Sequence, residues 1–153
     1  INVDYPSKED EMRIVNETST DEVPEVNVVF SKEDVLRYQH LVRSVPVSNH
    51  VVEYAVNLAR CSRPTEKDAP EYIRQYVEWG AGPRASQYLI LGAKSLAVLK
   101  GMPSPSCAEV KAVAPSVLHH RVIPNYNATG EDIDAQTIVQ WILAHVKQND
   151  YKG

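Results

Sequence analysis

Several residue types that mark particular protein classes are scarce in this chain of 153 residues. Its two cysteines, Cys61 and Cys107, lie far apart and lack the spacing of metal ligands, so we expect reduced thiols rather than a disulfide framework. No apolar run is long enough to span a bilayer. No long basic run accompanies the formal net charge of −4. These absences argue against a membrane span and against nucleic acid as the main partner.

Motifs that bind a catalytic metal or cradle a phosphate are also missing. No G-x-x-x-x-G-K-[ST] loop occurs in the chain. His119 and His120 are adjacent, so they would not face each other on a helix, and no cysteine or carboxylate stands at ligand spacing from them. We interpret the pair as cationic residues near a helix C-terminus, where they are favoured. The next residue, Arg121, could also reach a shared phosphate or an acidic partner.

What is present is the composition of a globular protein, with 43% apolar and 24% charged residues. The length suits one domain with a core, or a small domain and part of another. The first six residues, from Ile1 to Pro6, resemble the end of a strand that leaves a sheet, and the chain holds no further strands to complete that sheet. We therefore expect a piece of a longer protein.

Local sequence signals predict mostly helices. Capping residues followed by apolar periodicity predict helices that begin after Ser7, Ser31, Ser48, Ser106 and Asp134. A further helix is expected over residues 70–79, with its aromatic residues packed along one edge. Residues 26–30 could form a short strand or an extended lead-in, and residues 122–127 are extended by composition. Pro115 is expected to break the helix that follows Ser106 and to start a short one of its own.

The stretch 79–100 is the centre of this arrangement. Gly80 and Gly82 are expected to let the backbone turn sharply and approach a ligand, and Pro83 suits the first position of a helix. Because this helix is apolar on nearly every side, it should be the buried centre of a helical bundle. Arg84 then lies in the first turn, where the helix dipole repels a cation. An anion such as phosphate would explain the placement, but an arginine that merely extends to solvent would fit as well.

Four segments, in this order, resemble the C-terminal part of MoxR-family AAA+ ATPases. They are Asp4–Ser7 with the acidic helix after it, Val45–Ser48 together with Ala59–Pro64, Trp79–Ala85, and Val113–Arg121. The resemblance covers about residues 1–122, and Trp79–Ala85, which is similar to the second-sensor motif, is its most specific part. Many family members carry serine where this chain has Gly82, which removes one possible hydroxyl contact.

The resemblance implies a mainly α fold, a small helical bundle of the AAA+ lid type around one buried central helix, with at most short β segments. It implies three parts: residues 1–20 as the end of the nucleotide-binding core, 21–30 as a linker, and 31–150 as the lid domain. Arg84 would be the second-sensor arginine that contacts the γ-phosphate of ATP, with Gly82 and Pro83 beside it. No catalytic or metal-binding residue is expected within this chain.

For the intact protein, the resemblance implies ATP and Mg²⁺ as cofactors, a cytoplasmic location and a ring oligomer. The lid would pack against its own core and against neighbouring protomers. The implied work is chaperone-like remodelling or maturation of client proteins, often with von Willebrand A-type partners. The piece by itself should bind no cofactor and hydrolyse no ATP, because phosphoryl transfer needs a phosphate cradle, a metal and a positioned water together.

Two other functions remain open from the sequence. The chain could be a stand-alone helical interaction module that binds a protein partner through an apolar face and carries no nucleotide chemistry. A helical DNA-binding domain is also conceivable, although the low basicity argues against it.

Overall fold

The computed structural model describes residues 5–21 and 25–148, and the chain divides into two units, residues 1–37 and 38–153. The first unit contains helix α1 (Lys8–Thr18), which begins as predicted after Ser7, whose hydroxyl accepts a hydrogen bond from the Asp10 amide. No residue of α1 is buried. The predicted strand end at the start of the chain falls mostly on residues 1–4, which lie outside the described residues.

Helix α2 (Lys32–Ser44) crosses the boundary between the two units. Its start is capped reciprocally: the Ser31 amide donates to the Asp34 carboxylate at 3.1 Å, and the Asp34 amide donates to the Ser31 hydroxyl at 3.0 Å. The sequence left open whether residues 26–30 form a short strand or an extended lead-in to α2. The structure shows no strand there. Within the second unit, the Lys94 ammonium donates to the carbonyl of Arg43 near the end of α2, at 3.2 Å.

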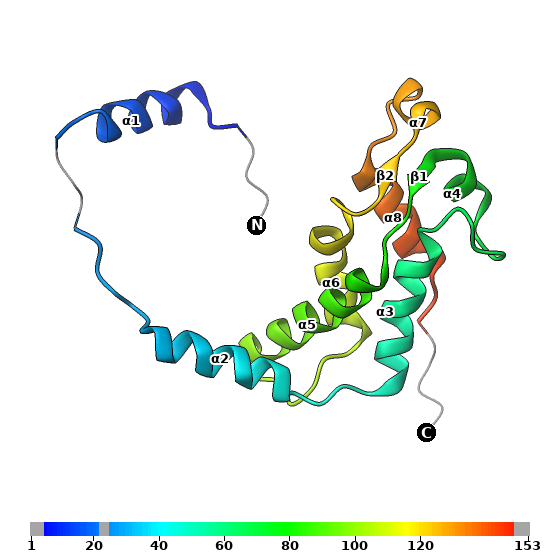
Figure 1. Cartoon of the computed structure of the whole chain (residues 1–153), viewed down its shortest axis with the longest axis horizontal. Coiled ribbons are helices and arrows are strands. Elements are labelled where there is room, and N and C mark those ends of the chain that lie inside the picture. Colours follow the sequence, from blue (N-terminus) through cyan, green and yellow to red (C-terminus); the bar gives the residue numbers. More distant parts are fainter. Residues whose placement is uncertain (1–4, 22–24, 149–153) are drawn as a thin grey trace. The chain divides into compact units, whose positions relative to one another are not determined.

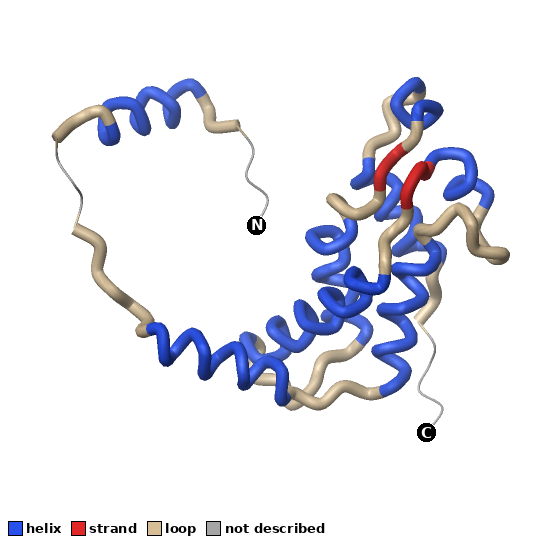
Figure 2. Tube along the Cα trace, in the orientation of Figure 1, coloured by secondary structure: helices blue, strands red, loops and turns tan. Residues whose placement is uncertain are grey.

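The second unit is a bundle of helices with one short sheet (Figures 1 and 2). Its elements after α2 are α3 (Asn49–Cys61), α4 (Glu71–Tyr76), β1 (Val77–Trp79), α5 (Pro83–Leu99), α6 (Cys107–Leu118), β2 (Ile123–Pro124), α7 (Tyr126–Gly130) and α8 (Ala135–His145). The two strands pair in antiparallel fashion, with Val77 opposite Pro124 and Trp79 opposite Ile123. This confirms the predicted fold class, a helical bundle with short β segments.

Helix α5 packs against both α3 and α6, and each of those two helices also contacts the other and α8. One face is fully buried and consists of Ala85, Leu89, Ala93 and Ala97, which follow each other at intervals of four residues. The prediction of burial on nearly every side was too strong, since Leu99 is 83% exposed. Figure 1 shows α5 running beside α6 with α3 at its flank.

Two helix predictions failed where tertiary contacts override local sequence. Helix α4 ends at Tyr76 instead of Trp79, because the next three residues find a strand partner in β2. Trp79 is therefore 70% exposed, while Tyr72 and Tyr76 pack on Trp141 with ring centroids 5.5 and 6.0 Å away. The expected edge of three packed aromatic residues is thus reduced to two.

Helix α6 continues through Pro115 to Leu118 instead of breaking at Ala114. Proline removes one backbone donor, but Ala114 and Leu118 on either side of it are fully buried in the core, and this packing favours a continuous helix. The residues after β2 were expected to be extended up to Asn127, whereas α7 begins at Tyr126. Its amide at Ala128 donates to the Asn125 side chain. Helix α8 begins after Asp134, as predicted.

No helix in residues 5–21 and 25–148 combines the length and the apolar character that crossing a bilayer requires.

The cap of α6 makes the stability of the bundle depend on pH. Hydrogen bonds from Ser106, and then from Lys100, lower the pKa of the buried Glu109 carboxyl from 4.5 to about 2. A lowered folded-state pKa contributes stability above the unfolded value, and this contribution is lost as the pH falls from about 5 toward 2. We expect Glu109→Gln to remove about 2 kcal/mol of stability at pH 7 and little at pH 2. Urea unfolding of both proteins at several pH values measures this difference, and a constant difference would contradict the assignment.

Candidate functional site

The start of α5 is a helix N-terminus with no internal compensation for its positive dipole. Gly82 is the N-cap and Pro83 the first helical residue, so no side chain caps the helix, and its first turn holds no acidic residue. Helices α1, α6, α7 and α8 all have a capping side chain. Helix α3 also lacks a side-chain capping bond, but it has no arginine in its first turn. Pro83 has no amide hydrogen, and the Ala85 amide donates to the Gly82 carbonyl at 2.9 Å. Within the described residues, the first turn of α5 therefore combines the unsatisfied amide of Arg84 with the guanidinium of the same residue.

Arg84 is exposed, and no hydrogen bond or ion pair joins its side chain to the described residues. Other arginines of the same unit are occupied: Arg60 and Arg63 both contact Glu66, and Arg74 donates to the Lys67 carbonyl. The guanidinium of Arg84 is thus not sealed in an internal salt bridge. An exposed cation beside an unsatisfied amide at a helix N-terminus can bind an anionic oxygen of a ligand.

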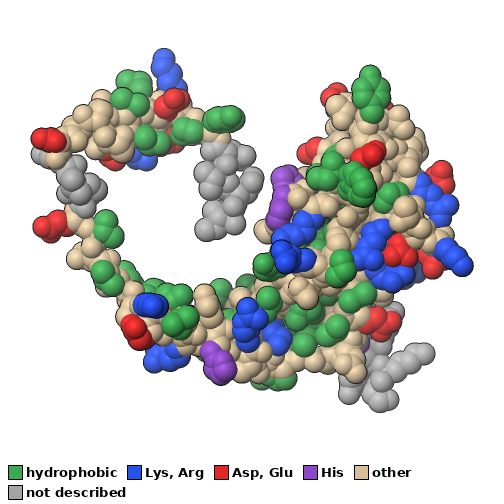
Figure 3. Space-filling view, in the orientation of Figure 1, with side chains coloured by type: hydrophobic (Ala, Val, Ile, Leu, Met, Phe, Trp, Pro, Cys, Tyr) green, Lys and Arg blue, Asp and Glu red, His purple; other side chains and the backbone are tan. Residues whose placement is uncertain are grey.

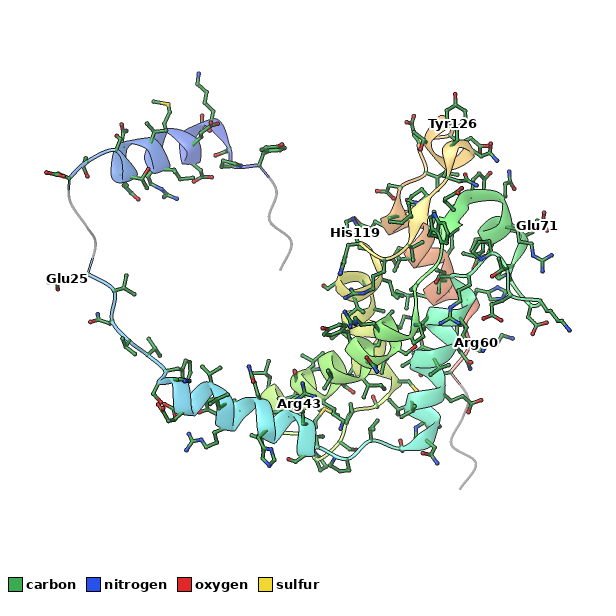
Figure 4. All side chains as sticks on the ribbon, in the orientation of Figure 1. Glu25, Arg43, Arg60, Glu71, His119 and Tyr126 are labelled. Carbon is green, nitrogen blue, oxygen red and sulfur yellow. The ribbon has the colours of Figure 1, made fainter. Side chains whose placement is uncertain are left out.

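The turn before α5 is held by the end of α3. Ala81 is 1% exposed; its amide donates to the Ser62 hydroxyl at 2.8 Å, and its carbonyl accepts from Nε of Arg63 at 2.9 Å. Arg60, labelled in Figure 4, lies on the last turn of α3 just before these residues. The orientation of the turn that carries Arg84 is therefore set by a segment about twenty residues earlier in the chain.

The two glycines of the turn have different surroundings. A Cβ on Gly80 would lie 2.4 Å from the Ser62 carbonyl oxygen and 2.6 Å from the Arg63 Cα, so Gly80 permits a close approach to the backbone at the end of α3. Gly82 has φ −78° and ψ 179°, which any residue adopts, and a Cβ there would meet nothing within 4 Å. Packing therefore explains glycine at residue 80, whereas neither crowding nor backbone angles require glycine at residue 82.

A second arginine lies on the same side of α5. Tyr88, one helical turn after Arg84, is 45% exposed, and the Arg121 guanidinium lies over its ring at 5.1 Å from the centroid. Arg121 also donates to the Val117 carbonyl and contacts His120. In Figure 3, histidine and Lys/Arg side chains lie next to each other at the end of α6, where Figure 4 labels His119. No local signal in the sequence around Arg121 indicates that Tyr88 packs beneath its guanidinium.

The remaining titratable groups include a histidine beside Arg121 and two cysteines. Among the described residues, no group of three His, Cys, Asp or Glu side chains could hold a metal ion. Burial, and then the charges of Arg121 and His119, lower the pKa of His120. Both cysteines are free, and burial raises the pKa of each thiol. A shallow pocket of about 180 Å³ is lined by residues that include Arg60, Cys61 and His145, and it does not include Arg84.

Comparison with known families and structures places this geometry in context. Residues 71–142 match the family described as "AAA lid domain". The chain is 32% identical over 146 residues to Chaperone MoxR1 of Mycobacterium tuberculosis, an alignment that covers 95% of the chain and 38% of MoxR1. It is 26% identical over 144 residues to YeaC, an uncharacterized protein of Bacillus subtilis, covering 94% of the chain and 42% of YeaC.

A solved structure is also similar to this chain. The crystal structure of a protein described as a candidate ATPase from Cytophaga hutchinsonii superimposes with a TM-score of 0.79 and 30% identity, covering 98% of this chain and 46% of the other. The chain therefore spans less than half the length of each of these relatives. The match over residues 71–142 includes the whole of α5 and the arginine at its start.

Proposed function

We propose that this chain, whose residues 71–142 match the AAA lid domain and which is similar to Chaperone MoxR1, is the nucleotide-sensing lid of an AAA+ ATPase. In this proposal Arg84 is the second-sensor arginine and contacts the γ-phosphate of ATP bound on a nucleotide-binding core. Gly82 and Pro83 form the uncapped turn, which leaves the amide of Arg84 open to the same phosphate. The lid would thereby sense which nucleotide the core holds.

The observation that carries the proposal is the exposed guanidinium of Arg84 without a partner among the described residues. A guanidinium and a helix N-terminus fit a phosphate group in both charge and hydrogen-bond geometry. Arg84 would supply only part of what phosphoryl transfer needs, because the reaction also requires a phosphate cradle, a metal and a positioned water. When bound, ATP and Mg²⁺ would supply the transferable phosphoryl group and its neutralising cation.

The proposal extends to how the chain is divided. Residues 1–20 would belong to the end of the core, 21–30 would be a linker, and 31–150 would form the lid. The capped start of α2 at Ser31 agrees with a boundary between residues 30 and 31, whereas the two units of the structure divide within α2, after Arg37. The whole protein would act in the cytoplasm as a ring of ATP-hydrolysing subunits, with each lid packed on its own core and on a neighbour. Its work would be chaperone-like remodelling or maturation of other proteins, and von Willebrand A-type proteins would be possible partners.

The test is Arg84→Ala in the full-length protein. Loss of a charge-assisted hydrogen bond costs about 1.5–3 kcal/mol, so we expect ATP turnover or ATP affinity to fall about 10- to 100-fold. Affinity for ADP should change little, because ADP has no γ-phosphate. Steady-state hydrolysis and calorimetric binding of a non-hydrolysable ATP analogue measure the two quantities.

A matched control is Arg43→Ala, which removes an exposed arginine near the end of α2 (labelled in Figure 4) and keeps the backbone carbonyl that Lys94 contacts. It should leave both turnover and affinity unchanged. Unchanged values for Arg84→Ala itself would reject the assigned role. A full-length protein that binds no ATP at all would favour the stand-alone interaction module instead.

A further inference from the structure

We propose that Ser62 and Arg63, at the end of α3, are positioning residues that hold the turn before α5 and thereby aim Arg84 at the phosphate. This inference rests on the proposed function of Arg84. It adds a part of the lid that lies before residues 71–142, the segment that matches the AAA lid family. The argument depends on three contacts between residues 62–63 and residues 80–81.

The first contact is made by a fully buried hydroxyl. Ser62 is 0% exposed, and its Oγ donates to the Ala59 carbonyl at 2.7 Å while it accepts from the Ala81 amide at 2.8 Å. One oxygen atom therefore joins the last turn of α3 to the turn before α5. A buried amide that loses its acceptor destabilises the folded state. The hydrogen bond to Ser62 therefore holds the Ala81 amide in this position.

The second contact is made by the neighbouring side chain. Nε of Arg63 donates to the Ala81 carbonyl at 2.9 Å, and its Nη1 donates to Glu66 at 3.2 Å. Glu66 also accepts from Arg60 at 2.6 Å, so one carboxylate connects α3 with the loop that follows it. Both backbone polar groups of Ala81 are thus bound by two consecutive residues, which fixes the peptide planes on either side of it.

The third contact is steric. The Ser62 carbonyl and the Arg63 Cα occupy the space that a side chain on residue 80 would need. The turn is therefore in direct backbone contact with the end of α3. Arg84 follows Ala81 by three residues, and Pro83 presets φ at the first position of the helix. If the contacts to Ala81 were lost, the first turn of α5 would consequently change its orientation.

The test uses Arg63→Met in the full-length protein, because methionine keeps much of the apolar side chain and removes the donors. We expect ATP turnover or ATP-analogue affinity to fall about 5- to 20-fold, with ADP affinity nearly unchanged. Arg63→Lys, which retains one donor group, should recover part of the loss. Amide hydrogen exchange at Ala81 and Ala85 should accelerate in Arg63→Met.

The matched control is Arg74→Met. Arg74 also uses its guanidinium to bind a backbone carbonyl, that of Lys67 at 2.7 Å, but this bond holds the loop after α3 and not the turn before α5. It should leave ATP affinity and the exchange of Ala81 unchanged. An equal loss in the two variants would overturn the positioning role, because it would indicate a general effect of loosening the loop.

A double-mutant cycle with Arg84→Ala separates positioning from stability. If Arg63 acts through Arg84, then Arg63→Met in the Arg84→Ala background should cause no further loss of ATP affinity. Independent, multiplicative losses would overturn the inference. If Arg63→Met left ATP affinity unchanged while Arg84→Ala lowered it, this inference alone would be overturned. If Arg84→Ala itself left ATP affinity unchanged, the proposed function would be overturned.

Discussion

Replacing Gly80 by alanine is expected to destabilise the helical unit by about 3 kcal/mol, because the new Cβ would overlap backbone atoms and not a flexible side chain. The nearest of these, the Ser62 carbonyl oxygen, would be 2.4 Å away. Relief requires the turn before α5 to move off the end of α3, which breaks the two hydrogen bonds of Ala81. The midpoint of urea unfolding, compared with that of the unchanged chain, measures the effect.

Gly82→Ser provides the control for this prediction. A side chain at residue 82 would meet nothing within 4 Å, and the backbone there is already extended. Serine is also a preferred N-cap residue and reduces the freedom of the unfolded chain, so we expect stability to rise by up to about 1 kcal/mol. If the two variants were equally unstable, crowding against Ser62 would not be the reason that residue 80 is glycine.

The second large effect is expected at Leu89, in the middle of the buried face of α5. Leu89 is 0% exposed and belongs to the core shared by α3, α5 and α6. Leu89→Ala should cost about 3 kcal/mol, from the lost burial of the side chain and from the cavity that it leaves. The decrease should appear in both urea and thermal unfolding.

Leu99→Ala is the matched variant, since it makes the same substitution on the same helix at a residue that is 83% exposed. It should change stability by less than about 0.5 kcal/mol. Comparable costs at residues 89 and 99 would contradict the orientation of α5 in the bundle, because they would require the face with Leu99 to be buried as well.

The parts of the fold that could be predicted are those that depend on only a few residues close together in the sequence. The caps at Ser7, Ser31, Ser106 and Asp134 follow this rule, because each capping side chain bonds an amide two or three residues later. The Gly-Pro-Arg start of α5 is equally local. Arg84 could be located at the first turn of a helix from the sequence for this reason.

The parts that failed depend on residues far away in the chain. Val77–Trp79 becomes a strand because it meets Ile123 and Pro124, and no local signal reports such a partner. Helix α6 likewise continues through Pro115 because the residues around it are buried in the core. In the candidate site, the hydrogen bonds of Ser62 and Arg63 to Ala81 cross nineteen and eighteen residues, so the sequence revealed the arginine but not what holds it.

The family resemblance was confirmed more fully than the role of the individual residues. The match to the AAA lid domain and the similarity to MoxR1 agree with the resemblance carried by Trp79–Ala85 and its flanking segments. The part of Arg84 in nucleotide sensing remains a prediction, and its exposure at an uncapped helix start is compatible with that part.

The hydroxyl of Ser62 places an evolutionary restriction on this region. A side chain at this site must donate and accept through one small atom in a space closed to water. Alanine offers neither function, and threonine brings an extra methyl group. Drift at residue 62 should therefore be slow in descendants of this chain, and where it happens it should be accompanied by compensating replacements at residues 80 and 81.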